Sequence, residues 1–359
     1  MSKRKVLFLV PYPQKEAPSQ RFRLELYEAE MRGADIEFVY EPFISEAVYA
    51  DYFQEGKTGK KAFGILKGFL RRYLLLLKMR SFDVVWIHRE TAPLGFPFYN
   101  YLVCKFFAKK TIFELDDAVW MPNVSSANAK FEWLKPYRNS LRLMKWAHTN
   151  VCGNEFLLEK ALTYNTNSVL IPTVVDTERV HNTLQNQATE LPKIGWTGSH
   201  STLPYLMDLI PALSELCKTD PFELVVISDV RPEIEFPPMR FIPWAKETEI
   251  QDLLHFHIGL MPLTDQEWAE GKCGLKVIQY QALGIVPAAS PVGVNTKLIG
   301  NHDRGVLCSS LSEWKNVISF LLRNHTVRKA YAEKCRPFIE EHYSLRSQRH
   351  KFLHLLEED

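Results

Sequence analysis

The sequence predicts an α/β fold made of two domains, each of them built on a parallel β-sheet. Three observations support this expectation: the chain has 359 residues, short apolar runs alternate with longer segments of helical periodicity, and the alternation restarts after a polar stretch at 176–192. A domain typically contains ~100–200 residues, so this length suits two domains. Strands that alternate with helices pair in parallel, because each helix carries the chain back across the sheet.

In the first half of the chain, apolar runs predict strands and the segments between them predict helices. The consecutive apolar residues of VVWI at 84–87 are typical of a strand buried on both faces. The expected strands are 5–10, 35–40, 83–88, 110–115, 149–152 and 168–171. The expected helices are 21–31, 60–80, 95–108 and 131–147, with an irregular insertion at 44–59.

The second half repeats this order after the polar linker. The expected strands are 193–196, 222–228, 239–242, 257–261 and 285–289, and the expected helices are 203–217, 246–255, 274–283 and 312–322. We therefore expect two Rossmann-like domains that face a cleft, over residues 1–180 and 190–335. Residues 336–359 are expected to form a C-terminal helix that packs back on the first domain.

Composition excludes several classes of protein. The formal net charge is only +2, which gives no general signal for nucleic-acid binding. The longest mostly apolar stretch, 62–79, contains basic residues and does not predict a membrane-spanning helix. The apolar run at 6–10 is too short for a secretory signal. The six cysteines form no CxxC pair, so we expect reduced thiols in a cytoplasmic protein.

The predicted helix at 60–80 combines an apolar face with seven basic residues. We expect its apolar face to lie in the core. Its basic face then either rests on an anionic membrane surface, as in interfacial helices, or is an ordinary solvated surface. The first alternative predicts a protein that is peripheral at the inner face of the membrane.

The segment at 257–292 carries the strongest functional signal. Ligands of open parallel sheets bind beyond the carboxyl ends of the strands, and this segment runs strand, loop, helix, strand. Gly274 begins the helix, where unpaired amides and the helix dipole attract phosphate, and Lys272 and Lys276 add positive charge. The alternative is an ordinary turn with solvated lysines.

The run GKCGLKVIQYQALGIVPAASPVG, which begins at Gly271, is similar to the donor-binding segment of GT-B glycosyltransferases of the family 4 type. Lys276, Tyr280 and Gly284 match that segment. Gln279 stands where the family usually has the Glu that binds the ribose hydroxyls, and Gln can also donate and accept hydrogen bonds. Further segments resemble the family at 82–93, 113–120, 171–180, 194–202 and 241–254.

The resemblance implies a GT-B glycosyltransferase with hexosyl-type transfer. It implies a nucleotide-diphosphate sugar donor held by the second domain, a glycan or lipid-linked acceptor, retention of anomeric configuration, and no metal or other cofactor. It also implies a catalytic role for His88, which matches a histidine that approaches the donor sugar, and for Lys276 at the donor diphosphate.

Other candidates follow predicted strands, and each has a plain structural alternative. Asp116, next to Asp117, is a candidate general base or hydroxyl-binding group, or a loop salt bridge. Adjacent strand residues point to opposite faces, so we do not expect both to reach one atom. No further oxygen ligands occur at a recognisable spacing, so no metal site is expected. The remaining candidates for substrate binding are Arg21, Arg23, Gly198, Ser199 and Trp244.

Two other functions stay open at this stage. A nucleotide-sugar epimerase would use the same phosphate contacts but would need added acid and base groups. A catalytically silent sugar-binding protein also suits the fold, and Gln279 favours keeping it in view. A NAD-dependent oxidoreductase is disfavoured, because no GxGxxG follows a predicted strand.

Overall fold

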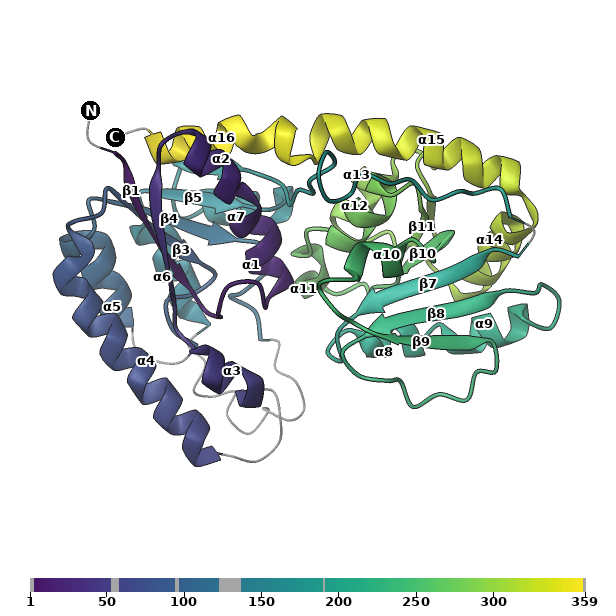
Figure 1. Cartoon of the computed structure of the whole chain (residues 1–359), viewed down its shortest axis with the longest axis horizontal. Helices are drawn as coiled ribbons and strands as arrows, with labels where there is room; N and C mark the ends of the chain where they lie inside the picture. The colour runs from purple at the N-terminus through teal and green to yellow at the C-terminus, as the bar shows by residue number, and fades with distance from the viewer. Residues whose placement is uncertain (1–2, 53–57, 94–96, 123–136, 190, 358–359) are drawn as a thin grey trace. The chain divides into compact units, whose positions relative to one another are not determined.

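The computed structural model describes residues 3–52, 58–93, 97–122, 137–189 and 191–357. By its internal contacts the chain divides into two compact units. Unit 1 comprises Met1–Thr173, Gly271–Cys273 and Gln348–Asp359, and unit 2 comprises Val174–Glu270 and Gly274–Ser347. The main boundary therefore falls after Thr173, rather than near residue 180. The predicted α/β class is confirmed, with one parallel sheet in each unit (Figure 1).

The sheet of unit 1 has six strands, in the order β2-β1-β3-β4-β5-β6. They are β1 Lys5–Val10, β2 Glu37–Pro42, β3 Val84–His88, β4 Lys110–Leu115, β5 Thr149–Cys152 and β6 Ser168–Leu170. All neighbouring pairs are parallel. β1 and β3 are buried along nearly their whole length, as their unbroken apolar sequences predict.

The helices of unit 1 differ from the predicted ones, except that the helix expected at 60–80 has close to the expected bounds. They are α1 Pro18–Arg23, η1 Glu25–Tyr27, α2 Glu28–Gly33, α3 Glu46–Tyr52, α4 Thr58–Met79, α5 Pro97–Leu102, η2 Val103–Phe107, α6 Arg138–Trp146 and α7 Glu155–Leu162. The single helix expected at 21–31 is in fact three short ones. The sequence predicted an irregular insertion at 44–59. This prediction is wrong at Glu46–Tyr52, which form α3, and residues 53–57 lie outside the described residues.

The sheet of unit 2 also has six strands, in the order β12-β11-β10-β7-β8-β9, and all its pairs are parallel. They are β7 Lys193–Gly198, β8 Glu223–Ser228, β9 Met239–Pro243, β10 Ile258–Met261, β11 Val286–Ala289 and β12 Val306–Leu307. The short strand β12 was not predicted. Its side of the core is closed by Trp314 and Ile318 from a following helix.

The helices of unit 2 include the one that the sequence singled out, α12. They are α8 Leu203–Met207, α9 Ile210–Leu216, α10 Glu249–Leu253, α11 Glu267–Glu270, α12 Leu275–Ala282, α13 Val294–Ile299, α14 Leu311–Arg323 and α15 His325–His342. The helix expected at 203–217 is broken, since Pro211 starts α9 as a new helix. α16 Leu345–Glu357 begins in unit 2, and its residues from Gln348 onward pack in unit 1.

Each sheet has one point where the strand order reverses, and ligands of such sheets bind at that point. In unit 1 the chain goes from β1 outward to β2 and then returns to β3 on the other side of β1. In unit 2 it goes from β7 outward to β8 and β9 and returns to β10. The carboxyl ends of β1 and β3, and of β7 and β10, are therefore where a site is expected.

The orientation of α4 corrects one prediction. Its buried side is formed by Gly68, Arg72, Leu76 and Met79, whereas the apolar side that contains Leu70 is exposed. The expectation that this apolar face lies in the core is therefore wrong. Among the described residues, no helix combines the length and the apolar character that crossing a bilayer requires.

Candidate functional site

In unit 1, His88 lies at the carboxyl end of β3, and its partner in register on β4 is Glu114. The Nδ1 atom of His88 bonds to the carboxylate of Glu114, and its Nε2 atom lies 2.8 Å from the hydroxyl oxygen of Ser19. The carboxylate of Glu114 accepts from Nδ1, and the Ser19 hydroxyl lies at the opposite ring nitrogen. His88 is 1% exposed, and both of its ring nitrogens have partners.

Arg23 completes this buried cluster. Its Nε atom lies 2.6 Å from Glu114 Oε1, and its Nη1 atom donates to the carbonyl of Ile171. Burial lowers the pKa of Arg23, but the Glu114 carboxylate outweighs it and the net pKa is raised. Arg23 is thus a buried, charged partner of Glu114 rather than an exposed first-turn arginine. Arg21 is half-buried, with its guanidinium 5.3 Å from the ring centroid of Phe22.

The acidic pair after β4 binds cations from two segments. Arg89 contacts Asp116 through two bonds of 2.5 and 2.9 Å, and its Nη2 atom lies 3.8 Å from Asp117. Lys272 lies 3.0 Å from Asp117, within the same compact unit. Both carboxylates reach Arg89, contrary to the prediction, because β4 ends at Leu115 and the following residues no longer alternate.

Asp116 is poorly suited to accept a proton. Burial raises the pKa of its carboxyl, but the charge of Arg89, and behind it that of His88, outweighs burial, so that the net pKa is lowered. A carboxylate with a lowered pKa is a weak base at neutral pH. Its geometry supports a role in positioning Arg89, which has a φ of 60° in the left-handed region.

Ligand atoms of His88, Glu114 and Asp116 all lie within 4.8 Å of one another, as in a metal site. The residues around them do not suit a cation, however. Arg23 pairs with Glu114 and Arg89 pairs with Asp116, so a divalent ion would have to displace two guanidinium groups. Their positive charge would also repel it. The cluster is therefore a balanced charge network of protein groups.

In unit 2, the end of β7 forms a tight turn of small polar residues. A Cβ atom on Gly198 would come within 2.5 Å of the Trp196 ring and 2.6 Å of the Thr202 hydroxyl, so only glycine fits there. The Ser199 hydroxyl lies 2.8 Å from that of Ser201. In the same loop, the backbone amide of His200 donates to Asp229 after β8. Gly198 and Ser199 thus lie at the reversal point of this sheet.

α12 begins at Gly274, which has a φ of +68°. A Cβ there would lie 2.6 Å from Leu298, so glycine is required for both conformation and space. Gly274 has no side chain that could cap this helix, and a helix start of this kind suits an anion. Lys276 is the second residue of α12, and its Nζ atom lies 4.7 Å from the ring centroid of Trp196 on β7.

This contact brings Lys276 to the strand whose end carries Gly198 and Ser199. The helix start, the ammonium group and the tight turn therefore belong to one region of unit 2, at the reversal point between β7 and β10. Positive charge and open backbone amides together suit a phosphate or diphosphate group. Lys276 is half-buried over an aromatic ring, so it differs from the solvated lysine of the structural alternative.

Two further candidates are held by packing contacts. Gln279 is 3% exposed, and its Nε2 atom lies 3.5 Å from Nε2 of His181. Trp244 is a partly buried residue that packs on a core cluster containing Val225 and Leu253. For Trp244 this agrees with the alternative of a packing aromatic residue.

Sequence reasoning did not select Glu114, Ser19 or Arg89, although they hold His88 and Asp116 in place. One signal was available for Glu114, because it is a single acidic residue within a strand that is otherwise apolar or neutral from Thr111 to Leu115. A buried acid is rare unless it is paired. Ser19 and Arg89 had no comparable signal, since each lies in a loop or short helix among other polar residues.

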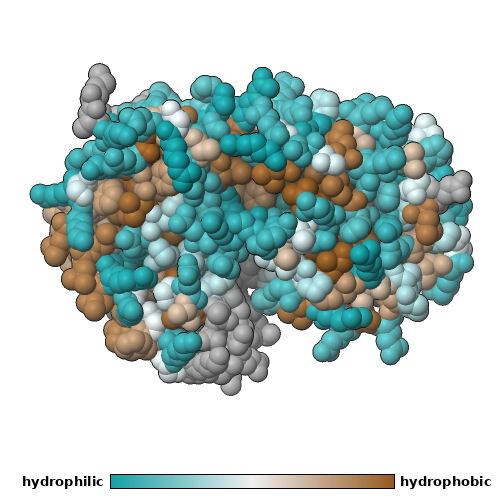
Figure 2. All heavy atoms as spheres, viewed as in Figure 1, coloured by the Kyte–Doolittle hydropathy of each residue, from teal (hydrophilic) through white to brown (hydrophobic). Residues whose placement is uncertain are grey.

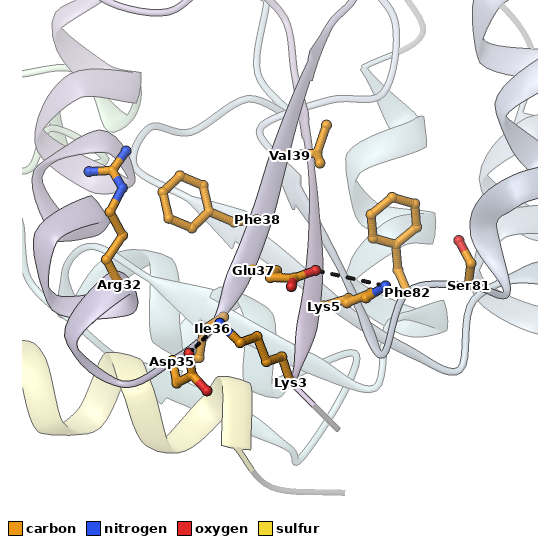
Figure 3. Close-up of a pocket in the computed structure, with 10 residues that line it drawn as sticks. All are labelled: Lys3, Lys5, Arg32, Asp35, Ile36, Glu37, Phe38, Val39, Ser81 and Phe82. Carbon is orange, nitrogen blue, oxygen red and sulfur yellow. Dashed lines mark ion pairs between the residues drawn. The ribbon is translucent and has the colours of Figure 1, made fainter. Parts of the chain in front are cut away.

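A groove of about 760 Å³ lies elsewhere in unit 1, at the amino ends of β1 and β2. Lys3 pairs with Asp35 and Lys5 pairs with Glu37 along it (Figure 3). These ion pairs are exposed and already satisfied, and the groove is at the edge of the sheet opposite to the strand ends discussed above. We therefore do not regard it as the site.

Comparison with solved structures identifies the fold as GT-B, and the similar structures are glycosyltransferases. A glycosyltransferase from Rickettsia africae ESF-5 has a TM-score of 0.69 at 16% identity, covering 99% of this chain and 98% of that chain. HepE of Anabaena, in complex with UDP-glucose, has a TM-score of 0.70 at 11% identity, covering 98% and 99%. Sucrose-phosphate synthase of Thermosynechococcus elongatus has a TM-score of 0.70 at 11% identity, covering 99% and 98%.

At these identities the comparison establishes the fold, and the function has to be argued from the site. A scan against protein-family models finds no match, and a search of curated proteins finds none either. The two parallel sheets with their surrounding helices are the two α/β domains of GT-B proteins.

Proposed function

We propose that this protein is a glycosyltransferase that moves a sugar from a nucleotide-diphosphate sugar to a glycan or lipid-linked acceptor. The observation that carries this proposal is the start of α12 after Gly274, where Lys276 lies over Trp196 of β7 at the reversal point of the unit-2 sheet. The GT-B fold supports it, as does UDP-glucose in the Anabaena neighbour.

In the proposed reaction, the diphosphate of the donor binds at the start of α12, and its negative charge grows as the glycosidic bond breaks. Lys276 and the helix dipole stabilise that growing charge without the help of a metal ion. We assign acceptor binding to unit 1 and contact with the donor sugar to His88, which Glu114 and Ser19 hold. We further propose hexosyl-type transfer with retention of configuration, with the leaving diphosphate helping to deprotonate the acceptor.

The proposed location is the cytoplasm, at the inner face of a membrane. All six cysteines are free thiols, which suits a reducing compartment.

Two experiments in sequence test this function. A panel of nucleotide sugars is first screened by thermal shift, since a ligand that binds only the folded protein raises its apparent stability. The donor that stabilises the protein most is then incubated with lipid-linked and soluble glycan acceptors, and the products are separated by mass and by anomeric configuration. A glycosylated acceptor supports the proposal.

The alternatives give different products in the same assay. An epimerase yields an isomeric nucleotide sugar without an acceptor. A silent binding protein shows a thermal shift with no product, and the amide of Gln279, buried against His181, is the feature that favours this outcome. Either result would overturn the proposed transfer.

A further inference from the structure

α4 presents a continuous apolar face to solvent. Six large side chains recur at helical spacing along one side, and they are between 46% and 79% exposed: Phe63, Leu66, Leu70, Tyr73, Leu74 and Leu77. We name these residues the α4 apolar face. Figure 2 shows apolar side chains gathered over this part of unit 1. Single exposed apolar residues are normal in proteins, whereas a contiguous patch marks an interaction surface.

The outward orientation of this apolar face is fixed by contacts on the opposite side of α4. Arg72 lies on the buried side of α4. Its guanidinium donates to the backbone carbonyls of Val10, Glu41 and Thr91. Burial lowers the pKa of Arg72 to about 10, so it stays charged at neutral pH. Arg71 donates to the carbonyls of Pro42 and Phe43. These bonds fix which side of the helix faces outward.

The neighbouring helices extend the patch. Phe98 and Tyr101 of α5 are 60% and 40% exposed, and Phe106 of η2 is 54% exposed. α4 packs against η2, and the Tyr73 ring lies 5.5 Å from the ring of Tyr99 in α5. The surface therefore combines leucines from one helix with aromatic residues from the next.

The charges that α4 and residues 97–107 contribute to this patch are all positive. Lys60, Lys67 and Lys78 lie along one edge of the α4 apolar face and are exposed, and Lys105 on η2 is exposed as well. The sequences of α4 and of 97–107 contain no Asp or Glu. An apolar stripe with aromatic residues and a row of lysines along one edge is complementary to the acyl boundary and headgroups of an anionic bilayer.

We propose that the α4 apolar face, with Phe98, Tyr101 and Phe106, inserts into the interfacial layer of an anionic membrane, while the flanking lysines contact lipid headgroups. This reverses the orientation predicted from sequence, in which the basic face touched lipid and the apolar face was core. The lysine stems lie beside the apolar surface and their ammonium groups reach the headgroups.

The hydrogen bonds of Arg72 connect α4 to the strand ends that carry the candidate site of unit 1. The carbonyls that Arg72 binds belong to the last residue of β1, to β2 and to the segment after β3. Docking of α4 would thus hold this edge of the sheet near the bilayer, where a lipid-linked acceptor resides. This consequence rests on the proposed function, whereas the docking itself does not.

The test is cosedimentation of the full chain with vesicles of phosphatidylcholine, with and without phosphatidylglycerol, in the absence of any donor. Wild type is expected to bind the anionic vesicles. A variant with Leu66→Gln, Leu70→Gln and Leu77→Gln is expected to bind at least tenfold more weakly and to remain folded, since these leucines are exposed. Lys67→Gln with Lys78→Gln should weaken binding severalfold at low salt only, because screening already removes the attraction at high salt.

A matched control places the same three changes on exposed leucines of unit 2: Leu184→Gln, Leu191→Gln and Leu311→Gln. It should bind like wild type. Vesicle binding that is equal in wild type and in the α4 leucine variant would overturn the proposal. So would a concentration-dependent dimer that the α4 leucine variant abolishes, because the patch would then be covered by a second copy. The readout needs no sugar transfer, so it stands apart from a failure of the proposed function.

Replacing Arg71 and Arg72 is not a valid test of lipid contact. Both guanidinium groups are bound to backbone carbonyls inside unit 1, so their loss should lower stability. The expectation that they contribute to a lipid-facing basic surface is therefore corrected.

Discussion

The Oγ atom of Ser19 lies 2.8 Å from the Nε2 atom of His88, and Glu114 holds the opposite nitrogen of the same ring. Residues from two other segments of the chain thus fix the orientation of one buried imidazole. A side chain held in this way pays no further rotamer entropy to keep that orientation.

His88→Ala should therefore lower sugar transfer strongly, by roughly 10²-fold or more, the scale for a lost positioned proton-transfer or polar group. Binding of the bare nucleotide diphosphate should be unchanged, because the diphosphate is assigned to α12 in unit 2. Turnover and calorimetric titration with UDP measure the two effects. An equal loss of UDP affinity would contradict a role at the sugar. Ser19→Ala is the companion variant, and it should cost less because Glu114 still orients the ring.

Lys276→Ala should lower turnover by roughly 10²–10³, the scale for removing one preorganised electrostatic partner of the transition state. Its contact with Trp196 is worth about 0.5–1 kcal/mol, so folding should change little. Lys276→Arg should restore only part of the turnover, because a planar guanidinium differs from an ammonium group in length and geometry. The control is Lys315→Ala, an exposed lysine on α14. Near-normal turnover of Lys276→Ala at saturating donor would contradict diphosphate binding at the 271–276 loop, which would then have only a structural role.

Glu114→Gln should lower the free energy of unfolding by about 3–5 kcal/mol, because it leaves the buried Arg23 without its counter-charge. The double variant Arg23→Met with Glu114→Gln should recover part of this loss, since no unpaired buried charge remains. Urea unfolding of both variants and of Arg23→Met measures the coupling. If the double variant loses as much stability as the two single variants added together, the ion pair contributes no coupling and only packing has been lost.

His257 should make the stability of unit 2 depend on pH. Its Nδ1 atom accepts a hydrogen bond from the Lys193 amide, and burial, with the nearby Arg328 and Lys193 charges, lowers the pKa of His257 from 6.5 to about 4. Because the folded-state pKa is lowered, the neutral ring stabilises the fold above pH 6.5, and this is lost as the pH falls toward 4. The loss should be roughly 1–3 kcal/mol.

His257→Asn keeps an acceptor oxygen near the Nδ1 position but cannot take up a proton. Between pH 7 and 4, its stability measured by urea unfolding should fall less than that of wild type by this amount. His325→Asn, at an exposed position on α15, should follow the wild-type curve. Parallel curves for wild type and His257→Asn would mean that the ring titrates equally in the folded and unfolded chains.

Much of the sheet architecture could be predicted because its signals are local. The four consecutive apolar residues in β3, and the Gly274 start of α12, are visible in a few adjacent letters. The broken helices were harder. Residues 21–31 have helical periodicity throughout, but the structure has three short helices there, because tertiary contacts such as Arg23 with Glu114 override propensity.

The candidate site was only half visible for the same reason. Lys276 and His88 stand in segments that resemble a family, so they were found. Glu114 and Arg23 are 91 positions apart, and Ser19 and His88 are 69 apart. Nothing in a single sequence indicates which distant residues will be in contact, so the partners that hold His88 could not be derived from it.

The amino-acid sequence by itself determined the α/β class, the two rounds of strands and helices, and the glycine-started helix with its lysine, since each follows from local periodicity and backbone preference. Only the tertiary structure decided which face of α4 is covered. A helix pattern reveals that an apolar stripe exists, but burial depends on what packs against it. Here the carbonyls at the ends of β1 and β2 accept hydrogen bonds from Arg72 and so turn the leucines outward, and the fold alone brings Arg72 to those carbonyls.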